Sequence, residues 1–273
     1  MSFGWVLSLI AVLVVGSAVL AAFGFRGRST TIGVDLGTTF SVVGIRDHHG
    51  KVTIVKDKLG NSIFPSVIAF SPDGKVKAAC YQALPYLQTD PANTIYNAKR
   101  FIGRSLDDPI VLEYAKNHPF RIVRVNSSIT PFGEIGFSLS PPTSSAGHAS
   151  KISSTSSPLP PRLISPEYVG TQVLLYLKKL TSEFLGHSQV NKAVIAVPAK
   201  FTKAQREATA AAYKAAGLKV VRVLEEPTAA AVAYQLHKKS NIKHILVYDW
   251  GGGTLDVSLL FVNPNSVEVC LTK

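Results

Sequence analysis

Two short segments of the sequence place an aspartate, glycines and threonines in the same order. Residues 35–39 are Asp-Leu-Gly-Thr-Thr, and residues 249–254 are Asp-Trp-Gly-Gly-Gly-Thr. In each segment an apolar stretch ends in the aspartate, small residues follow, and a hydroxyl opens the next stretch. Glycine permits tight turns whose successive backbone N–H groups form a nest of phosphate size. The leading carboxylates, Asp35 and Asp249, would hold Mg²⁺ at the edge of such a nest, directly or through water.

The repetition of this turn matters more than either copy. A single glycine-rich hairpin is a weak indication, because most such hairpins bind nothing. Two copies that begin 214 residues apart (249 − 35) indicate a duplicated fold that clamps phosphates between its halves. Neither copy is a P-loop, since no Gly-Lys-Ser/Thr sequence opens a helix after it.

Lys99 and Glu226 would complete a set of groups for phosphoryl transfer. Lys99 lies in a basic stretch, residues 96–104, and could stabilise charge on a terminal phosphate or orient an attacking water. Glu226 follows an apolar stretch and opens a helical pattern. Taken alone, the ordinary interpretations are favoured: a surface lysine, and an acid that complements a helix dipole.

Periodicity predicts the elements that must position these groups. Residues 30–46 alternate as strand, turn and strand, and from residue 166 onward helices and strands alternate along the chain. This alternation predicts an α/β fold with a mixed sheet covered by helices. The expected strands are 30–36, 40–46, 52–55, 67–70, 120–125, 192–197, 218–224, 243–249 and 254–262, and the expected helices are 77–88, 91–100, 107–117, 166–185, 202–216 and 226–237.

A serine- and proline-rich stretch interrupts this pattern. Between residues 138 and 157 serines dominate, and Pro160-Pro161 closes the stretch. We expect residues 126–165 to form a flexible insert, because so few large apolar side chains cannot form a core. The rest divides into residues 26–125 and 166–273.

Composition excludes several classes of protein. The chain has 273 residues, of which 46% are hydrophobic and 17% charged, so a mostly disordered protein is excluded. Its two cysteines cannot form a disulfide framework or a four-cysteine zinc site. The net charge of +12 suits an anionic partner, but the basic residues never run longer than pairs. We therefore expect no nucleic-acid partner.

The first 25 residues differ from the rest. Residues 3–25 carry no charge and would extend about 34 Å as a helix, enough to reach across a bilayer. Two interpretations stay open for residues 1–25: a cleaved signal peptide, or a membrane anchor that contacts the bilayer through residues 3–25. Both direct the chain to the secretory pathway. The sequon Asn126-Ser127-Ser128 would report such targeting.

Five stretches resemble the nucleotide-binding domain of the heat-shock seventy-kilodalton (DnaK-type) chaperones. They are TIGVDLGTTFS (31–41), NTIYNAKRFIGR (93–104), VIAVPAKFTKAQREA (194–208), VLEEPTAAAVAY (223–234) and LVYDWGGGTLDVS (246–258). The apolar N-terminus and Ser-Pro-Glu-Tyr-Val-Gly at 165–170 are most similar to the short microsomal member of that family. The resemblance implies an actin-like, ribonuclease H-like ATPase fold.

The resemblance also implies roles for individual residues, with ATP or ADP and Mg²⁺ as ligands. Lys99 matches the family's catalytic lysine. Glu226 and Asp249 match catalytic acids that arrange Mg²⁺ and the hydrolytic water, and Asp35 matches the magnesium-side carboxylate. The phosphate-binding positions match Gly37, Thr38, Thr39 and Phe40 in the first turn, and Gly251, Gly252, Gly253 and Thr254 in the second.

The family pattern would continue beyond Lys273 with segments that grip adenine and ribose. We therefore expect lobe I to be essentially complete and lobe II incomplete, with weakened ATP binding. Two functions stay open. One is an ATP-hydrolysing stress-protein core in the endoplasmic reticulum (the microsomal fraction), acting with co-chaperones or client proteins. The other is a catalytically silent fragment that acts only by binding partners.

Overall fold

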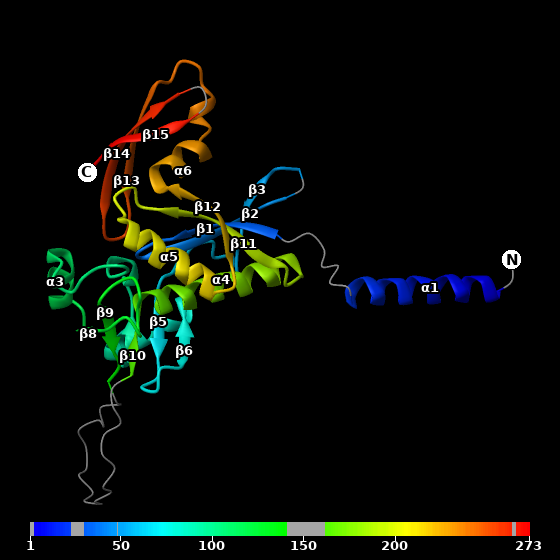
Figure 1. The fold of residues 1–273 in the computed structure, drawn as a ribbon, viewed down its shortest axis with the longest axis horizontal. Coiled ribbons are helices and arrows are strands. Elements are labelled where there is room, and N and C mark those ends of the chain that lie inside the picture. The colour runs from blue at the N-terminus through cyan, green and yellow to red at the C-terminus, as the bar shows by residue number, and fades with distance from the viewer. Residues whose placement is uncertain (1–2, 23–29, 48, 141–161, 264–265) are drawn as a thin grey trace, which may run out of the picture.

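The computed structural model describes residues 3–22, 30–47, 49–140, 162–263 and 266–273. Its first element, the helix α1 (Phe3–Ala22), lies apart from the rest of the fold (Figure 1). Among the residues that the structure describes, no helix combines the length and the apolar character needed to cross a membrane.

A six-stranded mixed sheet forms the centre of the molecule. Its main path runs β12-β11-β1-β2-β3, and β4 pairs with β2. The strand β1 is parallel to β11 on one side and antiparallel to β2 on the other, as expected for a mixed sheet. Residues alternate along β1, so the pleat that buries Val34 beneath the sheet turns Asp35 to the opposite face. The bounds are β1 (Thr30–Leu36), β2 (Phe40–Arg46), β3 (Val52–Ile54), β4 (Phe64–Pro65), β11 (Val190–Val197) and β12 (Lys219–Glu225).

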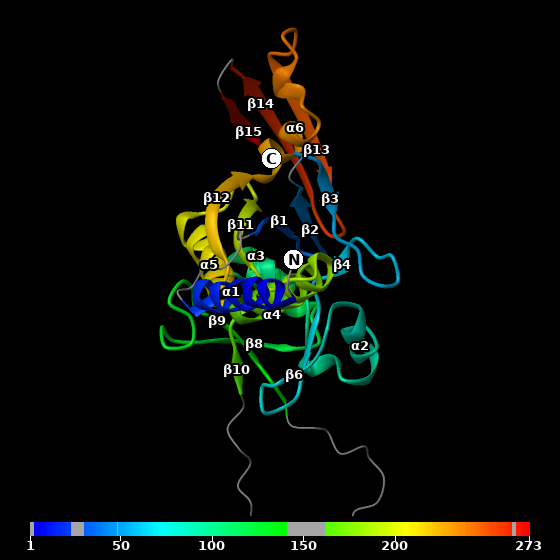
Figure 2. The same cartoon turned by 90° about the vertical axis from the view of Figure 1, so that its right-hand side faces the viewer.

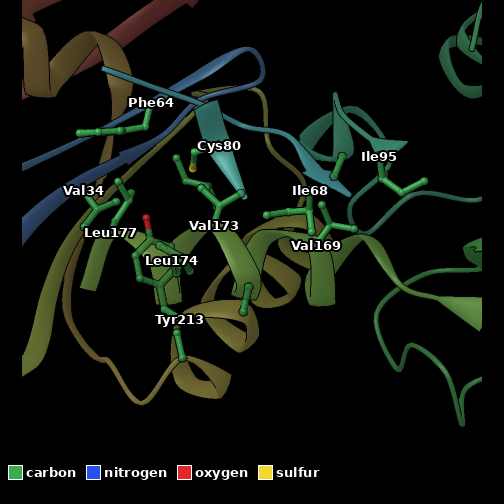
Figure 3. Packing of buried hydrophobic residues seen from close by; sticks show 14 of the residues in the cluster. Val34, Phe64, Ile68, Cys80, Ile95, Val169, Val173, Leu174, Leu177 and Tyr213 are labelled. Carbon is green, nitrogen blue, oxygen red and sulfur yellow. The ribbon is translucent and has the colours of Figure 1, made fainter. Parts of the chain in front are cut away.

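The helices α4 (Pro166–Leu185) and α5 (Lys203–Ala215) cover the face of the sheet opposite Asp35. Each begins where its sequence supplies a cap: the Ser165 side chain accepts from Tyr168 N, and Thr202 forms a capping box with Gln205. Figure 3 shows their apolar side chains packed with those of the strands in one buried cluster. Labelled members are Val34, Phe64, Val173, Leu174, Leu177 and Tyr213.

A smaller part of the fold lies beneath α4, and here two predicted helices are wrong. The ranges expected as continuous helices at 77–88 and 91–100 instead contain short strands and isolated helical turns of three or four residues. Residues 76–79 and 94–95 pair with the strand at 68–70, which holds them extended and leaves room only for short helical turns between them. The third predicted helix, 107–117, is confirmed as α3 (Pro109–Lys116). The other elements here are β5 (Ile68–Phe70), β6 (Val76–Ala79), η1 (Cys80–Ala83), α2 (Tyr86–Thr89), η2 (Pro91–Asn93), β7 (Thr94–Ile95) and η3 (Ala98–Arg100).

The ordered chain extends into both ends of the predicted flexible insert. The strand β9 (Ile135–Ser138) is fully buried, and it pairs with β8 (Arg121–Arg124) and β10 (Leu163–Ile164). The range 126–165 that was expected to be flexible is therefore too wide, because it includes β9 and β10. Apolar Ile135 and Phe137 alternate with small residues and are buried, as in a strand with one face in the core. The prediction missed this strand because it relied on the high serine content of the neighbouring residues. Residues 141–161 lie outside the described residues.

A second, three-stranded sheet rises above the first, with the helix α6 (Glu226–Ala233) between them (Figures 1 and 2). Its order is β13-β14-β15, and the first two strands have the predicted hairpin around residues 249–254. The third strand was not predicted. The remaining bounds are η4 (Leu236–Lys238), β13 (His244–Trp250), β14 (Leu255–Val262) and β15 (Val267–Thr272).

Candidate functional site

A cavity of about 710 Å³ lies between the two sheets. Its walls come from the β1–β2 turn, η3, α6, β13 and the β13–β14 turn. All twelve residues singled out from the sequence line it, although 219 positions separate the first from the last (254 − 35). They are Asp35, Gly37, Thr38, Thr39, Phe40, Lys99, Glu226, Asp249, Gly251, Gly252, Gly253 and Thr254. Their individual roles stay predictions.

The first turn is held in a shape that only glycine permits at its opening position. A Cβ added to Gly37 would lie 2.0 Å from the carbonyl oxygen of Phe40, far inside any normal contact. Ser66, which the sequence analysis did not single out, holds this turn from outside the cavity. Its backbone N–H donates to Thr39 O at 2.8 Å, and its hydroxyl donates to Gly37 O at 2.8 Å. The turn is therefore fixed at both ends.

The second turn closes on itself and touches the first. Gly251 N–H donates to Thr254 O at 2.8 Å. A Cβ added to Gly252 would lie 2.7 Å from Thr39 Oγ1, so the absence of a side chain lets the two turns meet. Backbone of both turns thus faces the same small volume from opposite sheets, which is the geometry of a clamp for an anion.

Lys99 and Glu226 form an ion pair across the cavity wall. Lys99 Nζ lies 2.5 Å from Glu226 Oε1, and the two side chains are 12% and 20% exposed. Lys99 sits on the single turn η3, which begins after Asn97 in a left-handed conformation (φ 57°). Glu226 is the first residue of α6, directly after β12. The ion pair therefore joins η3 to the first residue of α6, the helix that lies between the two sheets.

The cavity gathers negative charge with little compensation. Burial raises the pKa of Glu226 most, while Lys99 lowers it and the carboxylates of Asp35 and Asp249 raise it further. Asp35 opens onto the cavity, yet the surrounding protein raises its pKa by desolvation, opposed by Lys99 and reinforced by Asp249. With Asp256, four carboxylates line the cavity beside the one lysine, an arrangement that favours a bound cation.

The donor set fits Mg²⁺ held through water better than a direct protein cage. Within the described ranges, no three acidic, histidine or cysteine side chains converge closely enough to ligate one metal ion. Mg²⁺ in proteins keeps several waters and commonly takes one or two carboxylates plus phosphate oxygens. Asp35, Glu226 and Asp249 around an open cavity match that pattern.

Most of the rest of the wall comes from apolar residues that sequence reasoning missed, and one further acid that it missed, Asp256 of β14, also lines the cavity. Ala229, Ala230 and Tyr234 come from α6 and the residue that follows it, and Tyr248 comes from β13. The sequence offered one signal for the alanines, the run of small residues after Glu226. Small side chains there leave room for the cavity next to the helix.

Comparison with known families agrees with this geometry. A profile described as "Hsp70 protein" matches residues 31–157 and 159–273, which include both turns, Lys99 and Glu226.

Proposed function

This chain belongs to the Hsp70 family, and from that premise we propose that the cavity binds Mg-ATP and hydrolyses its terminal phosphoanhydride bond. Family membership implies an ATP-binding chaperone function, with co-chaperones or client proteins as partners. One observation supports this site as the place of binding: the two glycine-threonine turns touch each other at the wall of a single cavity. The same cavity is lined by Lys99 and by the carboxylates of Asp35, Glu226 and Asp249.

The residues divide the work between binding and hydrolysis. Backbone N–H groups of the two turns, 37–40 and 251–254, bind the phosphates. Lys99 stabilises the negative charge on the oxygens of the terminal phosphate while the water oxygen bonds to phosphorus, the bond to ADP breaks with its electron pair on ADP, and the water gives up a proton to a carboxylate or to solvent. The carboxylates of Glu226 and Asp249 accept hydrogen bonds from the attacking water and orient it. Asp35, Glu226 and Asp249 would hold Mg²⁺ through water, and the ion would supply positive charge next to the phosphates.

Calorimetry on the full chain tests this proposal. We expect saturable heat on titration with Mg-ATP and weaker binding in Asp249→Asn. Lys99→Met should keep nucleotide affinity within a few-fold and lose phosphate release by about a hundredfold or more, as with other lost electrostatic stabilisers. A folded sample that gives no heat with Mg-ATP or Mg-ADP would overturn the proposal.

The second candidate function is partner binding without catalysis. The strand β13 exposes large apolar side chains: Leu246, Tyr248 and Trp250 are 68%, 60% and 79% exposed, and the first two also line the cavity. Contiguous apolar surface of this kind favours protein–protein contact. The same titration distinguishes the two candidate functions, because a folded chain that binds no nucleotide would favour partner binding without catalysis.

We also propose that residues 1–25 direct the chain to the endoplasmic reticulum. Apolar side chains of α1 such as Leu9, Val12 and Val15 are 64%, 69% and 62% exposed, a surface suited to a targeting receptor or membrane interface rather than water. The sequon residue Asn126 lies in an exposed turn, where glycosyl transfer could reach it.

Glycosidase digestion of protein expressed in cultured cells tests this assignment. A mobility shift that disappears in Asn126→Gln would support entry into the lumen. Absence of a shift, together with protease digestion of the chain in intact microsomes, would refute it.

A further inference from the structure

We propose that Ser66 is a positioning residue that orients the first phosphate turn, residues 37–40, for nucleotide binding. The inference rests on the proposed function of the cavity but concerns a residue outside it. Ser66 does not line the main cavity; it lines a small space behind the turn together with Gly37 and Thr38.

Ser66 makes three contacts around this turn. Its backbone N–H donates to Thr39 O and its hydroxyl donates to Gly37 O, both at 2.8 Å. Its Oγ also lies 2.9 Å from the Oγ of Ser41. A serine hydroxyl has one hydrogen, so Ser41 is the donor in that contact and Ser66 relays the bond to Gly37 O.

These bonds decide where the turn's N–H groups point. In a trans peptide the C=O and the following N–H point in opposite directions. Ser66 draws the carbonyls of Gly37 and Thr39 away from the cavity, so the N–H groups of Thr38 and Phe40 turn the other way, toward it. A phosphate oxygen in the cavity would meet donors rather than repelling carbonyl oxygens.

The position of Ser66 is itself fixed by the sheet. It follows β4, whose residues pair with β2 at Phe40↔Pro65 and Ser41↔Phe64. Ser66 and Ser41 are buried, at 7% and 0% exposed. Because water has little access, the loss of the hydroxyl would leave Gly37 O without its partner.

Three variants of the full chain separate positioning from simple loss of stability. Ser66→Ala removes the hydroxyl, and Ser66→Thr keeps it, with the small space behind the turn available for the added methyl. Thr181→Val is the matched control. The Thr181 hydroxyl is fully buried and donates to Leu177 O at 2.7 Å within α4, and neither residue lines the cavity.

Two readouts are used: Mg-ADP affinity by calorimetry, and hydrogen exchange of the amides at residues 38–40 in the unliganded chain. We expect Ser66→Ala to weaken Mg-ADP about tenfold and to speed amide exchange in the turn. We expect Ser66→Thr to restore affinity to within about twofold. Thr181→Val should lower the melting temperature without changing either readout.

Equal affinities and exchange rates in Ser66→Ala and the unmodified chain would overturn the inference, as would an equal effect of Thr181→Val. If the unmodified chain binds no Mg-ADP, the proposed function fails, and the exchange rates alone decide whether Ser66 orders the turn. If Ser66→Ala does not fold, Ser41→Ala removes only the donor to the Ser66 hydroxyl, and a weakening of about two- to threefold is then expected. An unchanged affinity in that variant would count against the proposal.

Discussion

Replacement of Lys99 should destabilise the nucleotide-free chain more than replacement of its partner Glu226. Lys99 Nζ and Glu226 Oε1 are 2.5 Å apart, and both side chains are mostly buried. The direct attraction is about 7 kcal/mol at an effective dielectric constant near 20. Lost hydration and side-chain entropy offset most of it, and we expect a coupling energy of about 2 kcal/mol, between exposed and fully buried pairs.

The asymmetry follows from the other carboxylates. Lys99→Met roughly keeps the side-chain volume but removes the ammonium, which lies 5.9 Å from the centroid of the Phe201 ring, and leaves Glu226, Asp35 and Asp249 without their cation. Its cost should be about 3 kcal/mol. Glu226→Gln still accepts a hydrogen bond from Lys99 and removes one of three like charges, so its cost should be about 1 kcal/mol.

The assay is a double-mutant cycle by urea denaturation, followed by circular dichroism at pH 7.5 and at pH 4. The Lys99→Met penalty should shrink at pH 4, because the raised pKa values of Asp35 and Glu226 mean that both are protonated more readily as the pH falls. A coupling energy near zero would refute the reasoning. So would a Glu226→Gln variant that is less stable than Lys99→Met.

Three further predictions concern the same site and the two thiols. Burial raises the pKa of Asp35, so folded protein binds that proton more tightly than unfolded chain; melting temperature should fall as pH rises from about 4, and Asp35→Asn should flatten this profile. Gly252→Ala should abolish Mg-ADP binding in calorimetry, because its Cβ would lie 2.7 Å from a side-chain oxygen of the first turn; Gly253→Ala, whose nearest such atom is 4.0 Å away, is the control, and equal binding would contradict the contact. Burial raises the pKa of the Cys80 thiol to about 12 while Cys270 is exposed, so a thiol reagent should titrate one group in folded protein and two in urea; rapid reaction of both would contradict the burial of Cys80.

Much of the fold could be predicted where the signal is local. The strands on either side of both turns follow from alternating apolar residues, and α4 and α5 follow from apolar stripes with capping residues. Prediction failed at residues 77–100, where composition suits a helix but strands and single turns form. The strand β6 pairs with β5 in a local hairpin, but β7 pairs with β5 across 27 positions (95 − 68), and no window of neighbouring residues contains that second pairing.

The sequence by itself determined which segments of this protein are candidates for phosphate chemistry. Two turns with one order of aspartate, glycine and threonine indicate phosphate, because backbone conformation and side-chain type are properties of each segment alone. Only the tertiary structure decided what those turns do together. The contact of Gly252 with Thr39, the bond from Lys99 to Glu226 and the support of the first turn by Ser66 each join residues at least 27 positions apart. Such contacts depend on the path of the whole chain through two sheets, and local preference does not encode that path.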